Sequence, residues 1–160
     1  MLRTVTATRY VTPLREGGSL PAIVWFDAYT TNVDRTPRNT NMLIWGPRIW
    51  LIDHGASLYF HHTWDGYLAR SRSRFPQIKD HVLLPFAGAI DAADATLSAR
   101  LTPALIERIV GAIPEAWLAG EPAFASSEEH RAAYVTYLLN RLQSPRGFVE
   151  EAQHARAQLV

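Results

Sequence analysis

The sequence predicts a mainly α-helical domain of the α+β class, with one β-hairpin and a short N-terminal strand. Three observations lead to this prediction. The 160 residues, 48% of them apolar, are enough for a single domain, residues 1–160, with a sizeable core. Two apolar runs that flank the pair Gly46-Pro47 indicate the hairpin. From about Thr63 onward helix signals replace strand signals, so we expect the rest of the chain to be helical.

Residues 1–21 are predicted to form a short strand followed by a loop. Residues 3–11 are rich in Thr, Val and Tyr, which favour extended structure, and prolines and glycines interrupt residues 12–21. Residues 22–31 are apolar nearly all round, and Pro21 suits a first helical position because its missing N–H would be unpaired there. We therefore expect a short buried helix over residues 22–31, with a buried strand as the alternative.

A polar loop and the hairpin come next. Residues 32–41 have the composition of a loop. The apolar runs 42–45 and 48–52 then flank the turn signal, so we expect them to pair as two antiparallel strands. The hairpin ends in Asp53-His54-Gly55.

Start signals for helices recur in the C-terminal part. Thr102-Pro103 has the form of an N-cap followed by a first-turn proline. Ser126 and Glu129 fit a capping box, and an apolar stripe continues from there to Leu142. Ser144-Pro145 repeats the start signal for a last helix.

Composition and charge exclude several classes of protein. Charged residues are 19% of the chain and the net charge is +1, which argues against a disordered chain and against a specific nucleic-acid binder. The chain has no cysteine, so disulfides, thiolate catalysis and zinc–thiolate sites are excluded. No apolar run is long enough to span a membrane, and we expect a soluble, cytoplasmic protein. Of the 16 basic residues, only Lys79 is a lysine.

One group of polar residues has the order of parts found in a kinase C-lobe. Asp34 is followed five positions later by Asn39, then by the hairpin, and then by Asp53-His54-Gly55. In phosphoryl transfer, a carboxylate such as Asp34 can orient the attacking hydroxyl and accept its proton. The amide oxygen of Asn39 is a neutral hard ligand for magnesium, and Asp53 can bridge the metal to the phosphates. Gly55 permits the backbone to turn sharply away.

Two motifs resemble those of the HipA-like kinases, namely Asn32-x-Asp34-x-x-x-x-Asn39 and Ile52-Asp53-His54-Gly55. Residues 9–21 resemble the N-terminus of a group of bacterial HipA-like proteins, and residues 25–60 resemble their catalytic segment. The resemblance implies a kinase C-lobe-like helical domain and Mg²⁺ and ATP as ligands. It also implies phosphorylation of a Ser/Thr-type protein hydroxyl, with Asp34 catalytic and Asn39 and Asp53 as metal ligands.

The chain departs from the family in two places. Thr36 stands where related kinases often have a histidine, two residues after the catalytic Asp. The family also has a long segment, most of an N-lobe, between residues that here adjoin at Pro21 and Ala22, so residues 1–21 are a remnant of that lobe. Its phosphate-binding lysine has no counterpart, because Lys79 lies after Asp53. We therefore expect a weakly active or inactive kinase.

Several of these residues also have structural interpretations. Asp34 and Asn39 could simply form Asx turns, and Asp53-His54-Gly55 could be an ordinary turn. His54 fits a packing or hydrogen-bonding role better than that of a general base. The less favoured metal-site alternative uses the three histidines His54, His61 and His62 with Asp53 or Asp65. Arg70, Arg72 and Arg74 fit a solvated basic face better than a phosphate site, and Trp25, Trp45, Trp50 and Trp64 fit the core.

Three functions remain open at this level. The first is ATP- and magnesium-dependent phosphotransfer to a protein substrate that the sequence does not identify. The second is a noncatalytic helical interaction or scaffold module, in which the stripe of Tyr134, Leu138 and Leu142 binds a partner. The third is half of a kinase completed in trans by a second chain. Loss of a lobe should expose apolar surface, which favours homo-oligomers.

Overall fold

The computed structural model describes residues 3–4, 19–45 and 48–159. A small antiparallel sheet has the order β1 (Arg3–Thr4), β2 (Met42–Trp45) and β3 (Arg48–Leu51). In the predicted hairpin, Met42 faces Leu51 and Trp45 faces Arg48, while the turn at 46–47 lies outside the described residues. Of the strand expected over residues 3–11, only Arg3–Thr4 is described. The remaining elements are helices, which confirms the prediction of a mainly helical chain with a small sheet.

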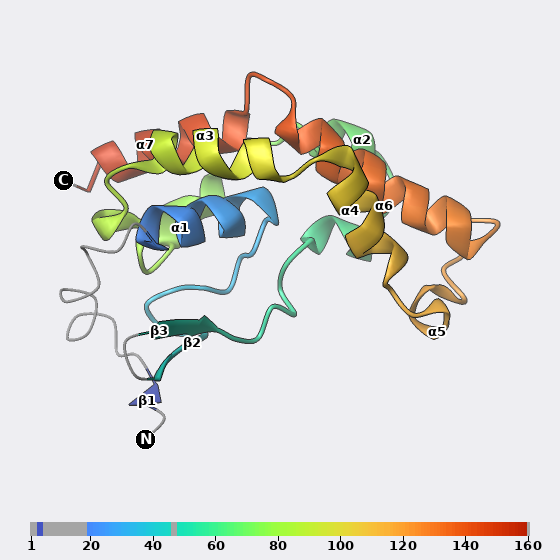
Figure 1. Ribbon diagram of the computed structural model, residues 1–160, viewed down its shortest axis with the longest axis horizontal. Helices are drawn as coiled ribbons and strands as arrows, with labels where there is room; N and C mark the ends of the chain where they lie inside the picture. The colour runs from blue at the N-terminus through green and yellow to red at the C-terminus, as the bar shows by residue number, and fades with distance from the viewer. Residues whose placement is uncertain (1–2, 5–18, 46–47, 160) are drawn as a thin grey trace.

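Three helices form the main layer of the molecule. The predicted buried helix is α1 (Ser19–Tyr29), and α3 (Ile90–Arg100) and α7 (Gly147–Ala157) lie side by side on one side of it. The hairpin lies on the opposite side of α1 (Figure 1). The apolar character of α1 on nearly all faces is explained by this position, because the helix is covered from both sides.

The main core is built around α1. Val24 and Trp25 of this helix are buried, and the Trp25 ring meets Phe148 of α7 edge to face at 5.4 Å between centroids. The Trp25 Nε1–H donates to Asp94 of α3 at 2.8 Å, and the Asp94 carboxylate also pairs with Arg146 at 2.7 Å. One carboxylate thus satisfies a buried indole and ties α3 to the start of α7.

The rest of the chain forms a second group of helices and turns. This group contains η2 (Tyr59–His62), α2 (Tyr67–Arg70), α4 (Pro103–Gly111), α5 (Glu115–Leu118) and α6 (Ser127–Leu142), whereas η3 (Pro76–Asp80) and η4 (Leu84–Phe86) pack against α1 and α7 in the main core. A smaller aromatic core lies here, in which Phe60 stacks on Tyr137 with ring centroids 3.5 Å apart. Among the described residues, no helix combines the length and the apolar character needed to cross a lipid bilayer.

The predicted helix starts are confirmed in two cases. The Thr102 hydroxyl accepts from the Leu105 N–H at 3.3 Å at the start of α4. At the start of α6, the Ser126 hydroxyl accepts from the Glu129 N–H at 3.1 Å. The last helix begins later than predicted, because Arg146 rather than Ser144 is its N-cap residue. Likewise α1 begins at Ser19, so Pro21 lies within the first turn instead of opening it.

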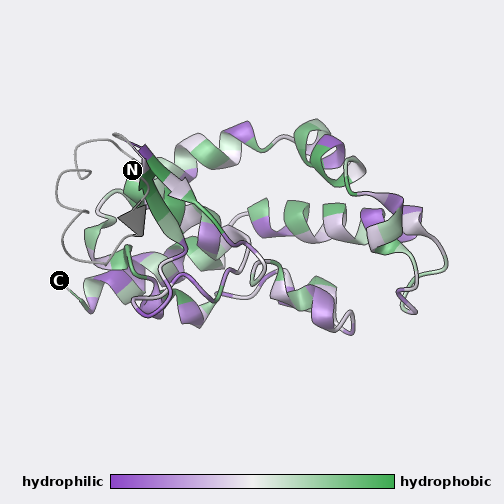
Figure 2. Cartoon of the chain, turned by 90° about the horizontal axis from the view of Figure 1, so that it is seen from below, coloured by the Kyte–Doolittle hydropathy of each residue, from purple (hydrophilic) through white to green (hydrophobic). Residues whose placement is uncertain are grey.

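The assignment of four tryptophans to the core was half wrong. Trp25 and Trp64 are buried, but Trp45 is 59% exposed and Trp50 is 47% exposed. Their rings lie 6.0 Å apart on the hairpin, which Figure 2 shows as mainly hydrophobic. A strand pattern does not say whether a second layer covers each face of the hairpin.

Candidate functional site

The loop that carries Asp34 begins at the end of α1. The helix ends in a left-handed residue, Thr31 with φ 55°, and the N–H of Asn32 donates to the carbonyl of Asp27 at 2.8 Å. This is a Schellman-type helix end. Asn32 also uses its side chain, which donates to the Asp27 carboxylate at 3.0 Å and accepts from the Asp34 N–H at 3.1 Å. The helix end therefore fixes where the loop starts.

A buried ionic network between Asp27, Arg35 and His81 anchors the loop that carries Asp34. The carboxylate of Asp27, with no exposed area, forms a two-point pair with Arg35, whose side chain is equally buried. His81 Nε2 lies 2.9 Å from the same carboxylate. His81 Nδ1 accepts from the Leu83 N–H at 3.0 Å, so the ring proton is on Nε2 and faces Asp27. Arg35 supplies the positive charge that a buried carboxylate requires.

The network sets the protonation states of its members. Burial alone would raise the pKa of Asp27, but the hydrogen bonds from His81 and Arg35 outweigh it and hold that pKa below its usual 3.8. Burial lowers the pKa of His81 below its usual 6.5, although Asp27 acts in the opposite direction. At neutral pH the network therefore contains ionised Asp27, charged Arg35 and neutral His81.

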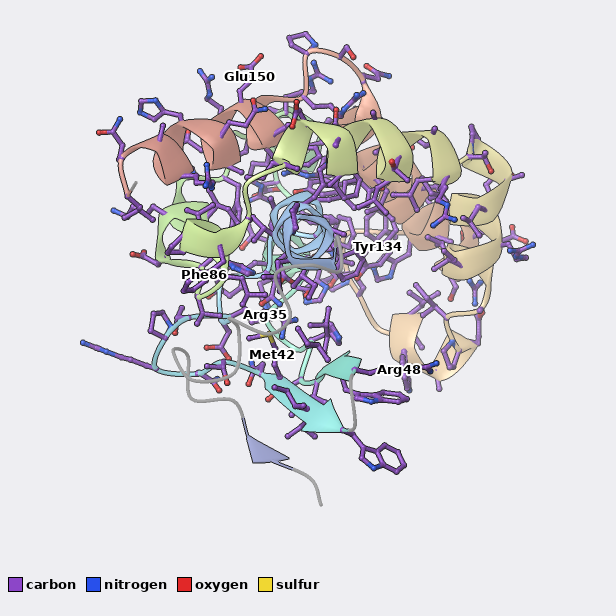
Figure 3. All side chains as sticks on the ribbon, turned by 60° about the vertical axis from the view of Figure 1, so that its left-hand side comes forward. Arg35, Met42, Arg48, Phe86, Tyr134 and Glu150 are labelled. Atoms are coloured by element: carbon purple, nitrogen blue, oxygen red, sulfur yellow. The ribbon has the colours of Figure 1, made fainter. Side chains whose placement is uncertain are left out.

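Arg35 also joins α1 to the hairpin. Its Nη1 donates to the carbonyl of Asn41, directly before β2, and its own carbonyl accepts from the Val82 N–H at 3.0 Å. Figure 3 shows Arg35 between α1 and Met42, the first residue of β2. Arg35 thus connects three segments that flank the loop, two through its guanidinium and one through its backbone carbonyl.

The Asp34 carboxylate is held at one oxygen by two side-chain amides. Its Oδ2 accepts from Asn39 Nδ2 at 2.7 Å and from Asn41 Nδ2 at 3.2 Å. Among the described residues, no donor meets Oδ1. An Asx turn would instead place a backbone N–H against the Asp34 carboxylate, and the described backbone provides none. The arrangement leaves one oxygen of an oriented carboxylate open to accept a proton.

The loop closes on itself through Thr36 and Asn39. The Thr36 N–H donates to the Asn39 carbonyl at 3.0 Å, and the Asn39 N–H donates to the Thr36 carbonyl at 3.2 Å. The Thr36 hydroxyl accepts from the same Asn39 N–H at 3.3 Å. Thr36 thus stabilises the loop from within. The Asn39 amide nitrogen faces Asp34, so its oxygen points away from that carboxylate.

Asp53 lies where the hairpin returns to this loop. Its φ is 50°, a conformation that is uncommon for residues other than glycine and that is often found at functional sites. Its carboxylate accepts from the Gly55 N–H at 3.4 Å, the contact that an ordinary turn also makes. His54 packs edge to face on Phe26 with centroids 6.2 Å apart, in keeping with a packing role.

Asn41 is a site residue that the sequence did not point out. Besides its contact with Asp34, its Nδ2 lies 3.4 Å from the Asp53 carbonyl, and its own carbonyl accepts from the Ile52 N–H at 3.0 Å. It is buried and has φ 44°. Asn41 thereby connects Asp34 to the segment of Asp53. The anchor Asp27 was also missed, although a carboxylate inside an apolar helical run signals a buried partner.

The donor set at this site suits magnesium only in part. Asp34, Asn39 and Asp53 offer hard oxygen ligands, but only two are carboxylates. Across the described ranges, no group of three His, Cys, Asp or Glu side chains is placed to hold a metal ion. Magnesium commonly uses one or two carboxylates together with substrate phosphates and water. The residues therefore fit a metal that arrives with a nucleotide better than a resident metal.

The histidines of the alternative metal site have other contacts. His61 Nδ1 lies 3.1 Å from the Tyr134 hydroxyl, and burial lowers the pKa of His61. The His61 and His62 rings meet edge to face at 4.6 Å. These contacts belong to the aromatic core near α6 and not to a ligand cluster.

The three alternating arginines act mainly within the fold. Arg72 donates to backbone carbonyls at the end of α6 and just after it, those of Asn140, Gln143 and Pro145. Arg70 donates to the Thr63 carbonyl, and Arg74 pairs with Glu150 at 2.7 Å. Arg72 and Arg74 are exposed, as the interpretation of a solvated basic face expects, and their guanidinium groups also bind within the fold.

Comparison of this chain with protein-family models, with curated proteins and with solved structures finds no match in any of the three.

Proposed function

We propose that this chain carries the phosphotransfer loop of a HipA-like kinase and acts on a protein hydroxyl with ATP and Mg²⁺. The observation that carries the proposal is that the Asn41 side chain contacts both the Asp34 carboxylate, which Asn39 also binds, and the main-chain carbonyl of Asp53. Asp34 is the catalytic base. Its Oδ2 is immobilised by two amides, so its Oδ1 can orient an acceptor hydroxyl and take the proton as the bond to phosphorus forms.

Asn39 and Asp53 would hold the metal. A bound magnesium ion would neutralise charge on the transferred phosphate. The Asn39 oxygen is available because its nitrogen is used by Asp34. The backbone carbonyl of Asp53 lies 3.4 Å from Asn41 Nδ2 at the hairpin exit, which fixes the position of this residue next to the loop.

The chain is expected to be a weak kinase or an inactive one by itself. Lys79, the sole lysine, is exposed. It lies in η3, which follows Asp53 and the hairpin in the sequence. Most of the catalysis in phosphoryl transfer comes from positioning and charge neutralisation of the nucleotide. Without a second cation on the phosphates, we expect the chain to keep more of its nucleotide binding than of its rate of phosphate transfer.

Calorimetric titration with magnesium and ATP tests the proposal. We expect saturable binding that requires magnesium and that D53N weakens at least about tenfold. D34N should leave binding nearly unchanged and abolish any phosphate transfer to an added protein substrate. D65N, which alters an exposed carboxylate, is the matched control and should behave like the wild type. Absence of heat with the wild type, or equal heat with D53N, would remove the ligand assignment.

A second candidate, completion in trans, is favoured by the exposed apolar residues next to the site. Phe26, Trp45, Trp50 and Ile52 are all exposed large hydrophobic residues on α1 and the hairpin. A second chain that supplies the missing lobe would cover them. Light scattering should then show an oligomer that W45S/W50S dissociates, and a strictly monomeric wild type would contradict this candidate.

The scaffold alternative is less favoured, because the stripe that would bind a partner is largely packed against the rest of the chain. Its proposed stripe of Tyr134, Leu138 and Leu142 packs against the two cores of the chain. Tyr134 contacts Phe60 and Trp64, and Leu138 touches both cores. A partner that binds the stripe would have to displace these contacts.

A further inference from the structure

A concave site lies away from Asp34, where α1 begins. It has a volume of about 340 Å³, at the lower end of the range of small-molecule sites. Its walls come from the start of α1, from η4 and the turn after it, and from the end of α7. The residues that matter below are Leu20, Pro21, Pro85, Phe86, Gly88 and Arg156.

The walls are apolar with one cation. Two prolines, a leucine and an aromatic ring form most of the lining, and Arg156 is the one charged residue among the described residues that line it. Figure 3 shows Phe86 on the η4 side of α1, beneath the layer of α3 and α7. Such a surface favours a ligand with an apolar body and a single polar end.

The Arg156 guanidinium meets neither a carboxylate nor a carbonyl among the residues that the structure describes, and its Nε is buried without a hydrogen bond. A Cβ built on Gly88 would lie 3.7 Å from Arg156 Nη2, so the guanidinium extends across this glycine at the pocket. An unsatisfied buried donor of a charged group is costly, and each one in a folded protein calls for an explanation.

The start of α3 adds to the positive potential. Ala89, which lines the pocket, is the N-cap residue of this 11-residue helix, and no side chain caps it. The first N–H groups of a helix carry partial positive charge. Both this helix end and Arg156 therefore favour a negative group at the same position.

We propose that this pocket binds a small anionic amphiphile, a molecule with one carboxylate or similar oxyanion on a short apolar body. The anionic head pairs with the Arg156 guanidinium near Gly88. The apolar body lies against Leu20, Pro21 and Phe86. No residue is shared with the Asp34 site, so the proposal is independent of the phosphotransfer function.

Octanoate, observed by two-dimensional NMR of the labelled full chain, is the probe that tests this site. We expect saturable shifts of the Gly88 and Ala89 amides, with octanol, which lacks the charge, binding at least about tenfold more weakly. R156Q should weaken octanoate binding about tenfold and R156K should retain most of it. R100Q, a change of an exposed arginine on α3, should have no effect.

Filling the pocket gives a second, independent variant. G88V keeps every charge and places methyl groups where the ligand head would lie, so it should abolish the octanoate shifts even if R156Q does not fold. Equal binding of octanoate and octanol would overturn the proposal. So would an unchanged affinity in R156Q, or shifts confined to the exposed Trp45 and Trp50.

Discussion

Replacing Asp27 by asparagine removes the anion of the buried network while keeping the size of the side chain. The substituted amide could still accept one hydrogen bond, but its NH₂ would face the N–H donors of Arg35 and His81. The Arg35 guanidinium, which has no exposed area, would then lack a counter-ion. Removing one partner of a buried ion pair costs about 3–5 kcal/mol. Domains are stable by only about 5–15 kcal/mol in total.

Urea unfolding at pH 7 measures this loss. We expect D27N to lower the free energy of unfolding by about 3–5 kcal/mol and the melting temperature by roughly 10 °C. D65N, at an exposed carboxylate, should change stability by less than about 0.5 kcal/mol. The double variant D27N/R35M should be less destabilised than the sum of the two single variants, because it leaves no unpaired charge. A loss under about 1 kcal/mol in D27N, or additive losses, would refute the role given to this network.

Three further predictions concern the fold around the site. Arg141 donates to four backbone carbonyls, among them those of Ala28 and Tyr29 at the end of α1. R141M should therefore lower the free energy of unfolding in urea by about 3–5 kcal/mol. A loss below about 1 kcal/mol would contradict this role. The lowered pKa of His81 means that the unfolded chain binds the proton more readily, so stability should fall as the pH drops from about 7 to 5. H81Q should make stability depend less steeply on pH. Part of the dependence should remain, because the pKa of His61 is also lowered. An unchanged dependence would contradict the assignment of a neutral His81. S126A should cost about 1 kcal/mol in thermal unfolding through loss of the α6 cap, and no change would mean that the cap is dispensable.

The elements that were predicted correctly depend on local chemistry. The hairpin follows from two apolar runs around a turn signal, and the caps at Thr102 and Ser126 need only a hydroxyl three residues before an N–H. The Asp34 loop was placed correctly for the same reason. Its residues Asn32, Asp34 and Asn39 are close in the sequence and bond to one another.

The elements that were missed depend on contacts between distant segments. His81 reaches Asp27 across 54 positions and Arg141 reaches the end of α1 across 112, so no local pattern identifies these pairs. Exposure of Trp45 and Trp50 depends on what covers the hairpin, which strand alternation does not specify. The extra contact of Asn41 with Asp53 depends on the register of the hairpin.

The sequence by itself determined the order of the parts, namely an apolar helix, a polar loop with Asp34 and Asn39, a hairpin and then Asp53. It also determined that one lysine, Lys79, comes after them. Only the tertiary structure decided which oxygen of Asp34 the described donors occupy, which buried groups hold the loop, and that Arg156 lines a pocket. The physical reason is that spacing along the chain fixes local hydrogen bonds, whereas burial and pairing of charges depend on how distant helices pack.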